Sequence, residues 1–220
     1  MAMPLVMPHV QGSPFLRFGA VLALVAFDQW SKVAVFRWLG VDPRSYEHND
    51  IPLLGTDWLR FANSCNGGAA FGQFDQFPYV LVLGRIAAVL FLTWLLLRAD
   101  PRPRLVLWAM ALVLAGALGN VIDNLGAGCT VFEPPDHPFL GVRDFVLVNF
   151  APVGIDWNFP AFNVADSCIT VGACAWILAG FLHRSEPRAT PEPGTPGAGR
   201  DDSEPTAGTR ETREARRSAE

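Results

Sequence analysis

The sequence predicts an all-α membrane protein with four transmembrane helices, both termini on the cytoplasmic side, and a small structured part outside the membrane. Half of its 220 residues are hydrophobic and only 17% are charged, whereas a water-soluble domain carries about a quarter charged residues. Four stretches are apolar over roughly the 20 residues that a helix needs to cross a bilayer. A formal net charge of −4 and the lack of CxxC and HExxH pairs argue against nucleic-acid-binding and metal-dependent classes.

The four predicted helices run over residues of about 15–38, 78–97, 105–122 and 162–182. Ionisable residues interrupt the first helix at Asp28 and Lys32, the second at Arg85 and the fourth at Asp166, whereas the third ends against Asp123. We expect the first run to be a retained helix rather than a secretory signal, because its basic region holds only Arg17 and no small-residue cleavage site follows the run.

Orientation follows from the basic residues of the connections, since cytoplasmic loops carry an excess of Lys and Arg. The connection 98–104 holds three arginines in seven residues, whereas the connections 39–77 and 124–161 hold two and one over much greater lengths. The short connection is therefore expected in the cytoplasm with both termini. The two long connections, which are rich in Gly, Pro and aromatic residues, face outward and are expected to contain structure.

The end of the chain changes composition abruptly. Residues 185–220 combine several prolines with mixed Arg and Glu and have almost no large apolar side chains. Such a segment buries too little surface to fold. We expect a transmembrane domain over 1–184 and a disordered cytoplasmic tail over 185–220.

Polar residues recur at the outer ends of the predicted helices. Asp28 and Lys32 lie four apart on one helical face, in the order that favours an ion pair. Two further pairs and one single acid are expected at the same level of the membrane: Asn120 with Asp123, Asn163 with Asp166, and Asp144 in the outer connection before the fourth helix. These groups either satisfy one another and set helix register, or they converge on one polar pocket.

An unpaired carboxyl at membrane depth must be protonated or shared, and Asp166 has no basic partner within its own helix. Two carboxyls brought together offer a mechanism, because like charges a few Å apart cannot both ionise cheaply. One then holds a proton while the other activates water, which is aspartic peptidase chemistry without a metal.

The chain resembles the lipoprotein signal peptidases (signal peptidase II) of bacteria over about residues 20 to 180. The resemblance rests on five blocks in the family's order, which are specific together although each is short. The blocks are Asp28-Gln29-Trp30-Ser31-Lys32, Asn66-Gly67-Gly68-Ala69-Ala70-Phe71, Gly119-Asn120-Val121-Ile122-Asp123, Gly141-Val142-Arg143-Asp144-Phe145 and Phe162-Asn163-Val164-Ala165-Asp166-Ser167.

The resemblance implies a multi-pass aspartic endopeptidase of the bacterial cytoplasmic membrane, with its active site toward the extracytoplasmic side and a short β-cradle in the outer part. Its substrates are prolipoproteins, cut just before a diacylglyceryl-modified cysteine. By position, Asp144 and Asp166 correspond to the catalytic pair. The residues that shape the substrate site correspond to Asp28, Lys32, Asn66, Gly68, Asn120, Asp123 and Asn163. No metal and no cofactor are implied, and the protein is expected to work as a monomer in contact with membrane lipid.

Two departures from the family pattern leave alternatives open. The family usually has arginine after the acid of the third block, and this chain has Asn124, so Asp123 needs another partner, for which Arg143 is a candidate. The segment 125–143 is about a dozen residues longer than usual and either extends a surface loop or gates the site. Cys65 and Cys129 lie in the two outward connections, either bridged or as free thiols.

Two other functions compete with peptidase activity. A catalytically impaired relative would bind lipid-anchored peptides without cutting them, and Asn124 motivates that alternative. A small transporter or proton channel would explain the buried charges, but not Asp144 or the block around Asn66. Broken or duplicated half-helices, which are typical of transporters, are not visible in the sequence.

Overall fold

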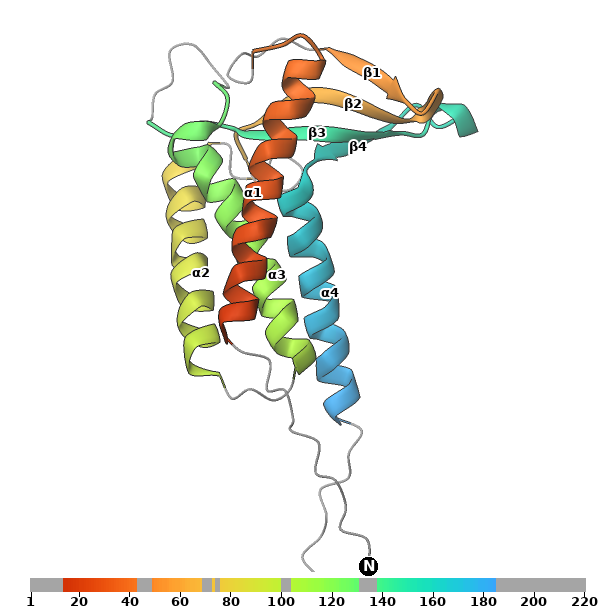
Figure 1. Cartoon of the computed structure of the whole chain (residues 1–220). Helices are drawn as coiled ribbons and strands as arrows, with labels where there is room; N and C mark the ends of the chain where they lie inside the picture. The colour runs from red at the N-terminus through yellow and green to blue at the C-terminus, as the bar shows by residue number, and fades with distance from the viewer. Residues whose placement is uncertain are drawn as a thin grey trace, which may run out of the picture. The chain divides into compact units, whose positions relative to one another are not determined.

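The computed structural model describes residues 14–42, 49–68, 73, 76–99, 104–130 and 138–184, which belong to one compact unit (Figure 1). The predicted tail 185–220 lies outside the described residues.

Within the described residues, four helices are long and apolar enough to cross a membrane. They are α1 (Pro14–Trp38), α2 (Pro78–Arg98), α3 (Arg104–Ile122) and α4 (Val164–Arg184). Their existence and order agree with the sequence prediction. The predicted start of the fourth helix at residue 162 is wrong by two residues, because Phe162 ends a strand and Asn163 caps the helix.

Helix α3 is the centre of the bundle and packs against α1, α2 and α4. Its small residues form a packing seam, since Ala111 and Ala115 are buried and Gly119 lies against α1. A Cβ at Gly119 would approach the carboxyl oxygen of Asp28 to 2.6 Å, and one at Gly116 would meet the backbone oxygen of Ala165. Small residues therefore let the polar groups of neighbouring helices approach α3 closely.

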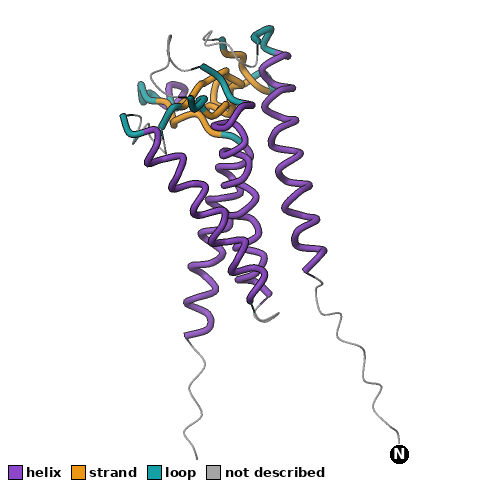
Figure 2. The backbone as a smooth tube through the Cα atoms, turned by 90° about the vertical axis from the view of Figure 1, so that its left-hand side faces the viewer, coloured by secondary structure: helices purple, strands orange, loops and turns teal. Residues whose placement is uncertain are grey.

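The two outer connections build one antiparallel sheet at the end of the bundle where α1 and α3 end (Figures 1 and 2). Its strands pair in chain order in the described part: β1 (Asp50–Leu53), β2 (Thr56–Asn66), β3 (Val142–Asn149) and β4 (Asn158–Phe162). The expectation of a small β part is met, and the all-α class is corrected to a helical bundle with a four-stranded sheet. The sheet joins α1 through a core of Val35, Phe36, Leu39, Val41 and Phe145.

The structure corrects the predicted environment of Asp144. The sequence placed it in an outer loop, where an acid is normally solvated, but it is the third residue of β3, opposite Ser64 of β2, and is 1% exposed. Part of the long 125–143 segment is also ordered. The chain continues from α3 into a π-helical turn (η2, Asp123–Ala127), and Cys129 then pairs with Gly141 in an isolated β-bridge. Residues 131–137 lie outside the described part.

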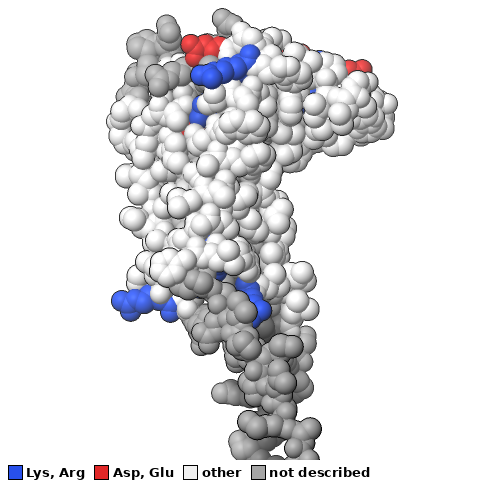
Figure 3. Space-filling view, in the orientation of Figure 1, with Lys and Arg blue, Asp and Glu red and all other residues white. Residues whose placement is uncertain are grey.

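The charged side chains gather at the two ends of the helical bundle. Figure 3 shows Lys, Arg, Asp and Glu near the sheet and Lys or Arg at the opposite end of the bundle, with a nearly uncharged surface between them on this face. Large apolar residues such as Leu83, Leu90 and Phe181 are exposed on the helices. Exposed apolar surface of this extent on helices of spanning length is typical of a protein embedded in lipid.

Cys65 of β2 and Cys129 are joined by a disulfide, with their Cα atoms 6.0 Å apart and a separation of 64 positions in sequence. The structure thus selects the bridged alternative. The bond ties the strand that ends at Asn66 to the segment that follows η2.

Replacing both bridged cysteines with serine is expected to lower the free energy of unfolding by about 2–4 kcal/mol, because the cross-link closes a long loop in the unfolded chain. Thermal unfolding in detergent measures the change. Cys174→Ser, which removes an exposed free thiol, serves as the matched control and should leave the midpoint unchanged. Equal midpoints for the double variant and the wild type would contradict a stabilising bridge.

Candidate active site

Asp144 and Asp166 come together where β3 meets the first turn of α4, and one residue holds both. The side-chain amide of Asn163 donates a hydrogen bond of 2.6 Å to Asp144, and the backbone N–H of Asn163 donates one of 3.1 Å to Asp166. Asn163 in turn accepts a bond of 2.9 Å from the backbone N–H of Asp166. This reciprocal pair is a capping box, which fixes the direction of the Asp166 side chain at the start of α4.

Two further amides complete the surroundings of the carboxyls. Asn120 of α3 donates to Asp166 at 2.9 Å, and Asn66 at the end of β2 donates to Asp144 at 3.1 Å. Each carboxyl thus accepts two hydrogen bonds from neutral donors. Asn66 also accepts a bond from the backbone N–H of Gly68, so the loop after β2 is tied to the same cluster.

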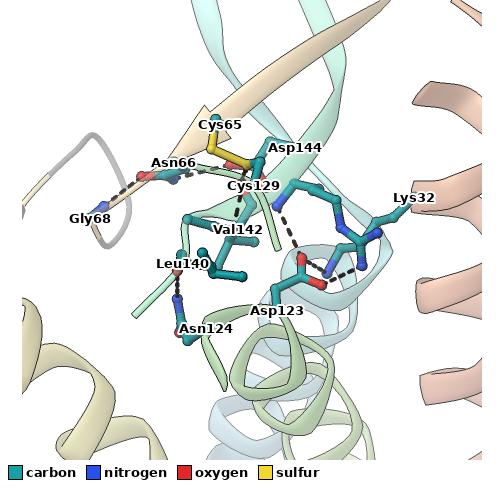
Figure 4. The surroundings of a disulfide bond; sticks show 12 residues. Lys32, Cys65, Asn66, Gly68, Asp123, Asn124, Cys129, Leu140, Val142 and Asp144 are labelled. Atoms are coloured by element: carbon teal, nitrogen blue, oxygen red, sulfur yellow. Dashed lines mark hydrogen bonds and ion pairs between the residues drawn. A yellow bond between two sulfur atoms is a disulfide. The ribbon is translucent and has the colours of Figure 1, made fainter. Parts of the chain in front are cut away.

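Behind the two carboxyls lies a chain of four alternating buried charges, Asp28, Lys32, Asp123 and Arg143, part of which Figure 4 shows. Lys32 pairs with Asp28 at 2.8 Å and with Asp123 at 3.1 Å, and Asp123 pairs with the Arg143 guanidinium at 2.6 Å. Acids and bases are equal in number, so the chain is neutral as a whole. That balance lets the charges remain away from water.

The ionic chain is hydrogen-bonded to the two-carboxyl cluster. Lys32 donates to the Asn120 amide oxygen at 3.3 Å, which orients the amide that donates to Asp166. Asp28 accepts the backbone N–H of Ala165 at 2.9 Å, next to Asp166 in sequence. The hypothesis that Asp28 and Lys32 form a self-sufficient pair is therefore too narrow, because both bind partners on other elements.

Asp123 is paired without the arginine that usually follows it in the family. Arg143 supplies a guanidinium from the next block, and its backbone N–H also donates to Asp123 at 3.0 Å. The candidate named from the sequence is confirmed in this contact. Asn124, in the position of the usual arginine, is buried and binds elsewhere.

The protonation of Asp144 follows from its place in the sheet. Burial raises the pKa of Asp144 well above its ordinary value, and the nearby Asp166 raises it further. The amides of Asn66 and Asn163 and the charge of Lys32 act in the opposite direction without cancelling this effect. Asp144 therefore tends to keep a proton that an exposed aspartate would release.

Two polar residues of this region had no assigned role in the sequence. Gln29 donates to the Gly119 carbonyl at 2.9 Å and accepts from Arg143 at 2.8 Å. Arg85 of α2 donates to Asn124 at 2.6 Å and to the Gly68 carbonyl at 3.0 Å. Arg85 could have been identified from the sequence, because it is a charged residue inside an apolar helix and such residues usually face a polar site.

All nine residues singled out from the sequence thus join one hydrogen-bonded cluster. It offers two carboxyls in different surroundings, one buried in a strand and one at a helix N-terminus, which suits a pair that exchanges protons with a substrate and a water molecule. Among the described residues, no group of three or more His, Cys, Asp or Glu side chains is arranged to hold a metal ion.

Comparisons with known proteins find relatives over most of the chain. Residues 20–182 match the family described as "Signal peptidase (SPase) II". The lipoprotein signal peptidase of Rhodopirellula baltica is 29% identical over 89% of this chain and 84% of its own length, and that of Acinetobacter baumannii is 33% identical over 77% and 85%.

The lipoprotein signal peptidase of Neisseria meningitidis is 31% identical over 77% of this chain and 91% of its own length. A bacterial membrane enzyme solved by the in meso method at 2.3 Å resolution has the same fold, with a TM-score of 0.59 and 24% identity over 77% of this chain and 89% of that one.

Proposed function

The chain belongs to the signal peptidase II family and removes signal peptides from prolipoproteins, and we propose that it does so as an aspartic peptidase with Asp144 and Asp166 as its catalytic pair. The observation that carries the proposal is the single residue Asn163, which binds both carboxyls while one of them is buried and inclined to keep its proton. An acid and a base are then present side by side at one pH, as two-carboxylate catalysis requires.

In the proposed reaction, the Asp166 carboxylate removes a proton from a water molecule, and the water oxygen attacks the carbonyl carbon of the scissile peptide bond. Asp144 gives its proton to the carbonyl oxygen, which produces a neutral tetrahedral intermediate. When the C–N bond breaks, Asp166 returns its proton to the departing amine and Asp144 regains one from the intermediate. Both carboxyls end as they began.

The other polar residues support this pair rather than react. Asn66, Asn120 and Asn163 orient the two carboxyls through their amides. Gly68 has no side chain, so the loop after β2 allows a peptide close to its backbone. The neutral network of Asp28, Lys32, Asp123 and Arg143 holds α1, η2 and β3 in the positions that the pair needs.

We assign the sheet and the site to the extracytoplasmic side of the bacterial cytoplasmic membrane, with both chain ends in the cytoplasm. The arginines of the short connection between α2 and α3 support this orientation. The substrate is then a prolipoprotein that diffuses in the bilayer plane by its diacylglyceryl group and is cut just before the modified cysteine. Residues 1–184 form the peptidase domain, which acts as a monomer, and 185–220 its tail.

Cleavage of a diacylglyceryl-modified prolipoprotein by the purified protein in detergent tests this function. The expected products are the signal peptide and a chain that begins with the lipid-bearing cysteine, both identified by mass spectrometry. The same prolipoprotein without the lipid should be cut poorly. Binding of the lipidated substrate without cutting would instead support the catalytically impaired alternative, against which the ion pairs of Asp123 weigh.

The raised pKa of Asp144 predicts a pH dependence of stability. Because its pKa is raised, the folded Asp144 carboxyl binds more protons than the unfolded one. Its contribution to the stability of the fold is fully present below 3.8, the ordinary pKa of aspartate, and is lost as pH rises through the folded pKa. The thermal midpoint of the wild type should therefore fall with rising pH relative to that of Asp144→Asn, which has no proton to lose. A constant difference between the two midpoints over that range would contradict a proton on Asp144.

A further inference from the structure

Arg85 binds two segments that are far apart in the sequence and that both lead to Asp144. Its guanidinium donates to the side chain of Asn124, in the turn after α3, and to the carbonyl of Gly68, in the loop after β2. Asn124 and Gly68 are both buried. The planar guanidinium, with its fixed fork of donors, is suited to hold two acceptors in one geometry.

From Gly68 the connection runs along the loop to the catalytic pair. The Gly68 backbone N–H donates to Asn66 at 2.9 Å, and the Asn66 amide donates to Asp144 at 3.1 Å. The Gly68 peptide is therefore held on both sides, by Arg85 at its carbonyl and by Asn66 at its N–H. A shift of this loop would move the amide that donates to Asp144.

From Asn124 a second connection runs to the strand that carries Asp144. The Asn124 amide donates to the Leu140 carbonyl at 2.7 Å, and the Leu140 backbone N–H donates to the Asn124 carbonyl at 3.0 Å. Leu140 lies two residues before β3 begins at Val142. Arg85 is thus connected to Asp144 by two routes. One runs through Asn66, which donates a hydrogen bond to Asp144, and the other through the start of β3, the strand that carries Asp144.

The placement of Arg85 in an apolar helix supports a role at this site. A charged residue in a membrane-spanning helix is costly to insert, so it is usually retained where it has a function. Few residues of α2 are buried, namely Val82, Leu92 and Leu96, and Arg85 is half-buried. The guanidinium also lies within electrostatic range of the Asp166 and Asp144 carboxyl groups.

We propose that Arg85 is a positioning residue for the catalytic pair, because it ties the loop after β2 to the turn after α3 and so holds Asp144 from two sides. The inference rests on the proposed function of Asp144. Because a misplacement of about 1 Å at a reacting group can cost a hundredfold in rate, loss of this tie lowers kcat by about 10- to 100-fold. KM stays unchanged, since positioning acts on the chemical step.

The test compares kcat and KM of Arg85→Gln with the wild type on a diacylglyceryl-modified prolipoprotein in detergent. Arg98→Gln, at the far end of the same helix where the guanidinium lies over the Trp94 ring, is the matched control and should keep the wild-type kcat. A kcat for Arg85→Gln within threefold of the wild type, or a raised KM at unchanged kcat, would overturn the positioning role.

A double-mutant cycle of Arg85→Gln with Asn124→Ala tests whether Arg85 acts on Asp144 through Asn124. If Arg85 acts through Asn124, the loss of kcat in the double variant is smaller than the product of the two single losses. A loss of kcat in the double variant equal to the product of the two single losses would overturn the action of Arg85 through Asn124. If Arg85→Gln is not recovered folded, Arg85→Lys replaces it in the cycle, since lysine keeps the charge and lacks the fork. Asp144→Asn in the same assay separates the two claims, because cutting that survives it contradicts the catalytic pair whatever Arg85 does.

Discussion

Asp144→Asn and Asp166→Asn are each expected to lower the rate of prolipoprotein cleavage by about a thousandfold or more. General acid and general base steps each contribute about 10²–10⁴-fold, and an asparagine supplies neither a proton nor a base. The amide differs little in size from the carboxyl, so the loss reflects chemistry rather than altered packing. Cleavage of a lipidated prolipoprotein by the purified variants in detergent measures the effect.

Asp156→Asn is the matched control for this pair. Asp156 is exposed in the connection between β3 and β4, and its replacement should leave the rate unchanged. Thermal unfolding of each variant confirms that it has folded. A folded Asp144→Asn or Asp166→Asn protein that cuts at a rate near that of the wild type would exclude the two-aspartate mechanism.

The second large effect concerns stability. Asp123→Asn is expected to lower the free energy of unfolding by about 3–5 kcal/mol. The substitution leaves two buried cations, Lys32 and Arg143, with Asp28 as the one remaining acid among the four buried charges. Removing one member of a buried ionic chain strands an uncompensated charge, which costs far more than the loss of a contact. Thermal or denaturant unfolding in detergent measures this loss.

Asp50→Asn provides the comparison, because Asp50 pairs with Arg60 in the sheet and both side chains are partly exposed. Such a surface pair is worth about 1 kcal/mol or less, since water screens it and Arg60 keeps a second partner in Asp57. Equal losses of stability in the Asp123→Asn and Asp50→Asn proteins would show that the buried chain has no special structural role.

The helices could be predicted closely from the sequence, because length and hydropathy alone decide which segments cross a bilayer. The polar pairs could also be placed at the same level of successive helices, although the sequence left open whether they converge on one cluster. These inferences need only local pattern and topology. The family resemblance then assigned roles to individual residues, from Asp28 in the first block to Asp166 in the last.

The burial of Asp144 could not be predicted in the same way. Its neighbours in sequence form a short mixed pattern, and its burial depends on the pairing of β3 with β2, almost 80 residues earlier in the chain. Register between such distant strands is set by the whole sheet and its packing against α1. The Cys65–Cys129 bond and the two contacts of Arg85 have the same origin in distant pairing.

The proposed reaction requires that Asp144 holds a proton at the pH at which the enzyme cuts, while Asp166 acts as the base. A difference infrared spectrum between the wild type and Asp144→Asn at that pH observes this proton directly. The account predicts that the variant loses the C=O stretching band of a protonated carboxyl. Loss of carboxylate bands alone would show that Asp144 is ionised in the resting protein and would contradict its role as the proton donor.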